Sequence, residues 1–339
     1  MGEATTATSP SPERPQPPRG AVIVARGLRR VFGHEVAVDH LDLDVPEGLI
    51  FGFVGPSGSG KTTAVRMLTG IDRPTEGEVT VLGCPTTRFD RALQARIGYM
   101  PQRSVQFPNL SVQENLNFVA SLYGLPLRRA DAITAALEET ELAEHRRKPV
   151  RDLSGGMQRR LALSAALIHR PEVLFLDEPT AGIDPVLRRK IWDRFEALRD
   201  DGCTLFVTTQ YVSEAAYCDR VAVLAEGRII AEDTPGGLRR RALGGDVVLL
   251  SPTRAVDDPT MQRLRDLEGV AEVERIGARF DLRLLVDDAD RRLPELQQWS
   301  AAHDLDIDTM HQELVSFDDV FTILITQHAD DMLVDEETA

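Results

Sequence analysis

The sequence predicts an α/β protein in which a parallel sheet is interrupted by a helical insertion and followed by a smaller α+β domain. Continuous apolar runs are typical of strands buried on both faces of a parallel sheet. Helical patterns separate these runs, the longest from about residue 110 to 170. The chain has 339 residues, enough for about two domains. The three apolar runs are Leu49–Val54, Val173–Leu176 and Thr204–Thr209.

The first unit is predicted to span residues 21–240. Residues 1–20 are rich in proline, serine and threonine, so we expect a disordered tail there. The first apolar run ends in glycines and leads directly into a helical pattern at Lys61–Leu68. A buried strand, a glycine loop and a helix in this succession form the context that a phosphate-binding loop requires.

The second unit is predicted to span residues 246–326. A basic triplet and two adjacent glycines at Arg239–Gly245 predict a linker before it. An acidic tail is expected at 327–339. The order of elements is β-α-β-β-α-β with one more helix, which is typical of a ferredoxin-like domain. The expected strands are Asp246–Leu250, Val270–Ile276, Phe280–Val286 and Leu305–Met310, and the expected helices are Pro259–Leu267, Arg291–His303 and Ser316–Ile325.

Composition excludes several classes of protein. Lysine and arginine number 39 against 54 aspartates and glutamates, a net charge of −15, which argues against a free-standing nucleic-acid binder. Three scattered cysteines exclude a disulfide scaffold and favour a reducing compartment. No apolar run approaches the roughly 20 residues needed to cross a bilayer, so membrane attachment would have to come from another molecule.

A phosphate-binding loop is indicated by Gly55-Pro56-Ser57-Gly58-Ser59-Gly60-Lys61-Thr62, which matches G-x-x-x-x-G-K-[ST]. Its glycines allow successive backbone N–H groups to point into one concavity, and the helix that follows adds its positive dipole end. In such loops the lysine reaches the β- and γ-phosphates and the threonine hydroxyl binds Mg²⁺. We therefore expect Lys61 and Thr62 to take these roles.

Two carboxylates end the second apolar run. Asp177 and Glu178 follow Val173–Leu176, at the strand end where α/β sheets bind their ligands. A solvated turn is the alternative for such a pair. Beside a phosphate loop, the expectation is that Asp177 holds Mg²⁺ and that Glu178 polarises the attacking water.

The segment Leu153-Ser-Gly-Gly-Met-Gln-Arg-Arg160 lies shortly before that strand. Ser154 is a good helix N-cap, and Gly155 and Gly156 allow a phosphate to approach bare backbone N–H groups. A capped helix start with two turn glycines is the alternative, and composition alone leaves it open.

Together these motifs resemble those of ATP-binding-cassette (ABC) ATPases, over roughly Ala21–Leu238. The resemblance implies a RecA-like core, an antiparallel β subdomain and a helical subdomain, with ATP and Mg²⁺ as ligands. It also implies a homodimer or paired cassette that binds ATP between the phosphate loop of one subunit and Ser154 and Gly156 of the other. The resemblance also implies that Phe32 would stack on adenine and that Gln102 would touch Mg²⁺ and the attacking water. It places Asp184 in the loop that joins the two subunits. Thr63 and Gly155 are implied to bind nucleotide as well.

One position departs from the family pattern. Where a histidine normally contacts the γ-phosphate, this chain has Gln210, after Thr204–Thr209. A glutamine amide can donate a hydrogen bond, but it cannot carry the charge of an imidazolium. With Glu178 intact, we expect an active ATPase that turns over more slowly.

The resemblance extends to the exporter branch for drugs and lipids, which includes daunorubicin-resistance-type ATPases. The matching stretches include Ile71–Gly77, Asn109–Asn117, Cys218–Val221 and Ser316–Phe321. The expected partners are polytopic permease subunits encoded separately, which would hold the chain at the cytoplasmic face of the membrane, with no nucleic acid. An importer ATPase and a soluble cassette protein acting on ribosomes or DNA are the alternatives. The mixed α/β pattern of the C-terminal part and the acidic charge disfavour them.

Overall fold

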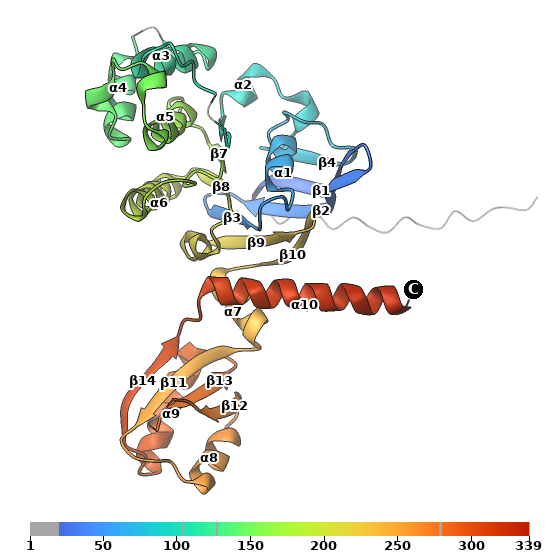
Figure 1. Cartoon of the computed structure of the whole chain (residues 1–339), viewed down its shortest axis with the longest axis vertical. Coiled ribbons are helices and arrows are strands. Elements are labelled where there is room, and N and C mark those ends of the chain that lie inside the picture. The colour runs from blue at the N-terminus through green and yellow to red at the C-terminus, as the bar shows by residue number, and fades with distance from the viewer. Residues whose placement is uncertain (1–19, 104, 127, 278–279, 339) are drawn as a thin grey trace, which may run out of the picture.

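The computed structural model describes residues 20–338 except 104, 127 and 278–279. The predicted disordered tail, apart from Gly20, lies outside the described residues. Among the described residues, no helix is both long and apolar enough to span a membrane. Figure 1 shows a larger unit of sheets and helices, a smaller unit beside it, and a long C-terminal helix between the two.

A six-stranded sheet forms the centre of the larger unit, in the order β10-β9-β3-β8-β7-β6. All neighbours are parallel except the edge pair β9 and β10. The three predicted strands are confirmed, and every residue of each is buried. The bounds are β3 (Ile50–Val54), β6 (Ile97–Met100), β7 (Val173–Asp177), β8 (Thr204–Thr209), β9 (Arg220–Ala225) and β10 (Arg228–Asp233).

Two apolar clusters sandwich this sheet. One joins Phe53 and Phe206 to α1 (Lys61–Leu68) and to an antiparallel sheet in the order β2-β1-β4-β5. The other joins Leu174 to Trp192 of α6 (Pro185–Asp200). The antiparallel sheet and the short helices after it comprise β1 (Ala21–Phe32), β2 (Glu35–Pro46), β4 (Glu76–Val81), β5 (Cys84–Pro85), η1 (Thr86–Arg88) and α2 (Arg91–Gln94).

The helical insertion has a core of its own. Leu116, Ile133, Leu137 and Leu161 pack together within it, and α5 also packs against β6. A reciprocal capping box between Ser111 and Glu114 begins α3. The elements are α3 (Val112–Leu122), α4 (Ala130–Glu139), η2 (Ala143–His145), η3 (Val150–Asp152) and α5 (Gly155–Leu167).

The smaller unit confirms the predicted β-α-β-β-α-β order. Its strands form an antiparallel sheet in the order β12-β13-β11-β14, and residues of both helices share one apolar core with that sheet. This is a ferredoxin-like arrangement. The elements are β11 (Asp246–Pro252), α8 (Asp258–Arg265), β12 (Val270–Arg275), β13 (Leu282–Val286), α9 (Ala289–Ala302) and β14 (Ile307–Glu313).

Two predicted stretches have a different secondary structure from the one expected. The expected linker Arg239–Gly245 is mostly helix, because α7 (Pro235–Leu243) runs from its Thr234 N-cap to a left-handed C-cap at Gly244. The expected break between 326 and an acidic tail 327–339 is replaced by one helix, α10 (Phe317–Thr338).

The start of α10 packs on the larger unit and not on the ferredoxin-like domain. Phe317, Val320 and Leu324 lie three and four residues apart, so they share one face of the helix. That face joins the same core cluster as Ala215 and Leu238 of the larger unit. The last helix therefore returns the chain to the first domain (Figure 1).

Candidate functional site

The phosphate loop follows β3 directly and depends on glycine at two places. Gly60 has φ 99°, and a Cβ built on it would collide with the carbonyl oxygen of Ala37 in β2. A Cβ on Gly55 would collide with the carbonyl oxygen of Leu224 in β9. Residues 56–58 are exposed at the tip of the loop, and Thr63 lies half-buried in the first turn of α1. The loop is thus fixed by its neighbours and open at its tip.

Lys61 is the basic group of the loop, and its side chain is buried. Its amino group donates hydrogen bonds to the carbonyl oxygens of Gly55 and Pro56, both at 2.8 Å. Burial lowers the pKa of Lys61, while the charges of Glu178 and Asp177 act to raise it. The ammonium group is therefore held at the loop by carbonyl oxygens. It can exchange them for phosphate oxygens without further burial of the Lys61 side chain.

Asp177 ends β7 and is fully buried. Its Oδ1 accepts hydrogen bonds from the hydroxyls of Thr62, at 3.3 Å, and Thr208, at 2.6 Å. Its Oδ2 is buried and has no hydrogen-bond partner among the described residues. Burial raises the pKa of this carboxyl against the lowering effect of its two hydroxyl partners. An unpartnered buried carboxylate oxygen beside a threonine hydroxyl fits a hard cation such as Mg²⁺.

Glu178 and Gln102 lie together, although 76 residues separate them in the sequence. The Gln102 amide donates to Glu178 Oε2 at 3.0 Å. The Glu178 N–H donates to the Thr208 hydroxyl at 3.0 Å, and its backbone is left-handed with φ 50°. A non-glycine residue in this conformation is held by its surroundings. The second carboxylate is thereby turned away from the strand and towards Gln102.

Gln210 and Phe32 each lie at the end of a strand, Gln210 directly after β8 and Phe32 as the last residue of β1. Gln210 is exposed and directly follows β8, whose last residue, Thr209, accepts a hydrogen bond from the Gly55 N–H at 3.3 Å. Phe32 ends β1 with 46% of its surface exposed. The Arg30 guanidinium covers the Phe32 ring at 4.5 Å from its centroid. An exposed ring backed by a cation is a suitable platform for a flat aromatic base.

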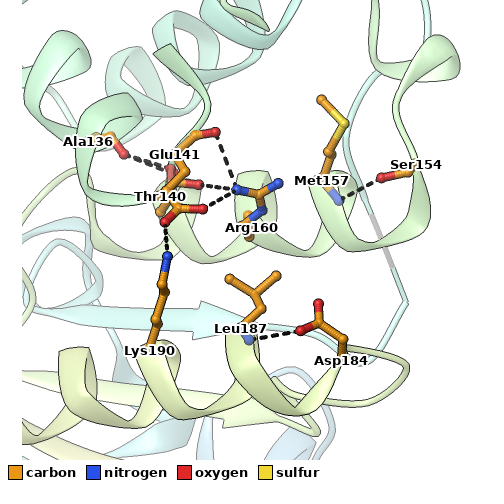
Figure 2. A network of polar contacts seen from close by, with 10 residues as sticks. Ala136, Thr140, Glu141, Ser154, Met157, Arg160, Asp184, Leu187 and Lys190 are labelled. Atoms are coloured by element: carbon orange, nitrogen blue, oxygen red, sulfur yellow. Dashed lines mark hydrogen bonds and ion pairs between the residues drawn. The ribbon is translucent and has the colours of Figure 1, made fainter. Parts of the chain in front are cut away.

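Ser154 and Asp184 cap two helices. The Ser154 hydroxyl accepts from the Met157 N–H at 3.3 Å to begin α5, and the Asp184 carboxylate accepts from the Val186 and Leu187 N–H groups at 3.1 and 3.0 Å to begin α6. Figure 2 shows both caps. A Cβ built on residue 155 or 156 meets no atom within 4 Å, so the glycines after Ser154 border open space.

A polar network ties these two capped helices together. Arg160 of α5 donates to the Thr140 carbonyl oxygen at 3.1 Å and to the Glu141 carboxylate at 3.3 Å. Lys190 of α6 reaches the same carboxylate at 2.6 Å (Figure 2). Lys190 lowers the pKa of Glu141 by hydrogen bonding and charge. The carboxylate and the ammonium are both more than half exposed, so the ion pair contributes little to stability.

Arg159 is a site residue that the sequence analysis missed. Its guanidinium points into the site and donates to four backbone carbonyl oxygens, with distances of 3.2 Å to Asp177 and 3.3 Å to Pro179. The other two acceptors are the carbonyl oxygens of Gln102 and Glu178. Burial lowers its pKa, and the two neighbouring carboxylates oppose that effect. Nothing in the local pattern distinguishes Arg159 from Arg160, whose contacts lie elsewhere.

Comparisons with known proteins show which family this chain resembles. The sequence profile of a family described as ABC transporter matches residues 38–181. The daunorubicin/doxorubicin resistance ATP-binding protein DrrA of Streptomyces peucetius is 36% identical over 323 residues, covering 95% of this chain and 97% of that protein. The Nod factor export ATP-binding protein I of Cupriavidus metallidurans is 39% identical over 250 residues, covering 72% and 82%.

A solved structure is also similar. It is a dimeric ATP-binding cassette in a post-hydrolysis state bound to ADP and Pi, and it matches with a TM-score of 0.59 and 26% identity over 62% of this chain and 98% of that one. The matched family segment contains the phosphate loop, the Leu153–Arg160 segment and β7. The match to DrrA extends over the ferredoxin-like domain as well, because it covers almost the whole chain. The chain therefore belongs to the ABC transporter family, as an ATP-binding and ATP-hydrolysing subunit, and the relatives that it resembles include an export ATP-binding protein.

Proposed function

We propose that this chain closes as a dimer on two Mg-ATP and drives separate membrane-spanning subunits that export drugs, lipids or other hydrophobic compounds. The observation that carries the catalytic part is the convergence of Lys61, Thr62, Asp177, Glu178 and Gln102 at the ends of β3, β6 and β7. The relatives' names, daunorubicin/doxorubicin resistance and Nod factor export, support the direction of transport.

Each of these residues has a distinct task in hydrolysis. Lys61 exchanges its carbonyl partners for the β- and γ-phosphate oxygens. Thr62, Asp177 and Gln102 would hold Mg²⁺, which would neutralise charge that develops on the phosphates. Glu178 accepts a proton from the attacking water, and Gln102 orients that water. Gln210 donates a hydrogen bond to the γ-phosphate without a full charge, so turnover is slower than a histidine would allow.

A second copy of the cassette completes each site. Ser154 and the two glycines after it present a helix N-terminus to open space, where a phosphate of the partner's ATP would be stabilised. Asp184 begins the neighbouring helix, and Val186 beside it has 71% of its surface exposed. An apolar side chain exposed at such a position supports an interface there.

The permease subunits would dock beside Gln102. Val105, Phe107, Phe118 and Leu122 are all exposed, from 41% to 72%, and lie between the end of β6 and the end of α3. The rings of Phe107 and Phe118 meet edge to face with centroids 4.8 Å apart. An apolar group of this kind is suited to a short helix of a partner. Through these subunits the chain would lie at the cytoplasmic face of the membrane.

The ferredoxin-like domain is assigned a regulatory or dimer-stabilising role. It is joined to the nucleotide-binding unit on both sides, by α7 before it and α10 after it. The return of α10 to the core of the larger unit supports this assignment, because a movement of the small domain would act directly on that core.

The test is Glu178→Gln in the purified full chain. We expect phosphate release to stop while ATP still produces a stable dimer, measured by light scattering after size exclusion, because the amide cannot accept the proton of water. The matched control is Glu172→Gln at the other end of β7, where the carboxylate is exposed and paired with Arg96 at 2.6 Å. Hydrolysis by Glu178→Gln at the wild-type rate would refute the assignment of the base.

The permease part is tested separately. Affinity capture of the chain from detergent-solubilised membranes, read by mass spectrometry, should recover one or two polytopic proteins that lack a cassette of their own. Phe118→Glu should abolish this capture without changing the ATPase rate of the isolated chain. Recovery of ribosomal or repair proteins instead, in high salt, would overturn the transporter proposal.

A further inference from the structure

Glu214 is a fully buried carboxylate to which the mechanism above gives no task. It lies in η4 (Val212–Tyr217) with 1% of its surface exposed. A buried carboxylate destabilises a fold unless hydrogen bonds and opposite charge compensate it. Here Oε1 accepts from the Thr180 hydroxyl at 2.7 Å and Oε2 from the Thr209 hydroxyl at 2.6 Å. The Arg188 guanidinium lies 3.5 Å from Oε1.

The two threonines belong to two different segments of the candidate site. Thr180 lies two residues after Glu178, in a turn where the Ala181 N–H donates to the Glu178 carbonyl oxygen at 3.2 Å. It also directly precedes the loop that ends at Asp184. Its hydroxyl bond to Glu214 therefore fixes the backbone that carries the proposed base.

Thr209 fixes the other segment. Its carbonyl oxygen accepts from the Gly55 N–H at 3.3 Å, and its hydroxyl accepts from the Tyr211 N–H at 3.0 Å. Gln210 is thus enclosed in a turn that the Thr209 side chain closes, and that same hydroxyl donates to Glu214. One carboxylate holds both the turn of Gln210 and the turn after Glu178.

Arg188 connects this cluster to α6. Its guanidinium lies over the Tyr211 ring at 4.4 Å and donates to the Ile183 carbonyl oxygen at 3.3 Å. The residues around Glu214 thus come from β8, η4, the loop after β7 and α6. These are the elements that would border the γ-phosphate and the partner cassette.

We propose that Glu214 is a positioning residue for ATP hydrolysis. It fixes the positions of Glu178 and Gln210 relative to each other, on either side of the reacting phosphate. The proposal rests on the proposed roles of Glu178 and Gln210. The carboxylate does not touch ATP, so its loss should lower kcat and leave nucleotide affinity intact. Displacement of reacting groups by about 1 Å can lower rates by about 100-fold.

The experiment compares Glu214→Gln with Thr209→Val in the full chain. A glutamine amide can accept from only one of the two hydroxyls, and valine removes one hydroxyl at nearly constant shape. We expect each variant to lower kcat by about 10- to 100-fold, with the KM for ATP and the affinity for a fluorescent ATP analogue unchanged. The double variant should be no slower than the slower single one, because both remove the same link.

A matched control separates positioning from stability. Ser164→Ala removes a buried hydroxyl that lies 2.7 Å from the Thr140 hydroxyl in the helical insertion. We expect it to lower the melting temperature by as much as Thr209→Val with kcat unchanged. If Glu214→Gln keeps the wild-type kcat, or loses kcat, ATP affinity and melting temperature together, the positioning role is refuted. A wild-type chain that binds ATP without hydrolysing it would instead refute the proposed function itself.

Discussion

Replacing Arg159 by methionine should impair both the stability and the ATPase rate of this protein. The guanidinium donates to the backbone carbonyl oxygens of Gln102, Asp177, Glu178 and Pro179. A hydrogen bond from a charged donor contributes about 1.5–3 kcal/mol, and bonds that share one side chain do not add. We therefore expect unfolding free energy to fall by about 3 kcal/mol, measured by urea denaturation.

The catalytic effect follows from which segments Arg159 joins. It holds the backbone of Gln102 against the end of β7, so its loss lets the proposed base and its glutamine partner drift apart. We expect kcat for phosphate release to fall by about 10- to 100-fold. Methionine keeps most of the apolar stem, so packing of α5 is retained.

Arg160 provides the matched control for this prediction. It is the next residue of the same helix, but its guanidinium contacts Thr140 and Glu141, both outside the site (Figure 2). Arg160→Met should leave kcat unchanged. If Arg159→Met is less stable but hydrolyses ATP at the wild-type rate, the guanidinium is only a packing element and the reasoning is wrong.

Two further predictions concern Asp177 and Phe32. Burial raises the pKa of the Asp177 carboxyl, so the folded state binds the carboxyl proton more tightly than the unfolded chain does. The stability of the nucleotide-free protein should therefore decline as pH rises from 3.8 through the raised pKa. In Asp177→Asn, the melting temperature should depend less on pH, and ATP turnover should fall at least about 100-fold. If the melting temperature of this variant still declines with pH as in the wild type, other groups cause the decline. Phe32→Ala should raise the KM for ATP about 10-fold at constant kcat, with Phe32→Trp near wild type, because stacking on a base contributes about 1–3 kcal/mol. An unchanged KM in Phe32→Ala would place the adenine elsewhere.

Local patterns predicted much of the fold and the core of the candidate site. The run before Gly55 and the run before Asp177 are continuous and apolar, and both became fully buried strands. The helix Lys61–Leu68 has the predicted bounds, because the glycine loop fixes its start. The β-α-β-β-α-β order was likewise predictable, since each of its elements is marked by its own periodicity and turns.

Boundaries were less predictable where the signal was ambiguous. The basic and glycine-rich stretch Arg239–Gly245 suggested a linker, yet most of it is the last part of α7, and the helix ends only at its Gly244 C-cap. The apolar positions of Phe317, Val320 and Leu324 predict a helix with one apolar face, but nothing in the spacing says which domain that face covers.

By itself the sequence predicted which residues would carry phosphate chemistry, because a glycine loop, a strand end and a helix cap are each specified within a few neighbouring residues. Only the tertiary structure decided how these residues are held. Thr62 and Asp177 are 115 residues apart in the chain, and the Thr180 hydroxyl reaches Glu214 across 34 residues. The acceptors of Arg159 and the Thr180 partner of Glu214 come together because parallel strands bring their ends to one edge of the sheet, where side chains distant in sequence share the same buried space.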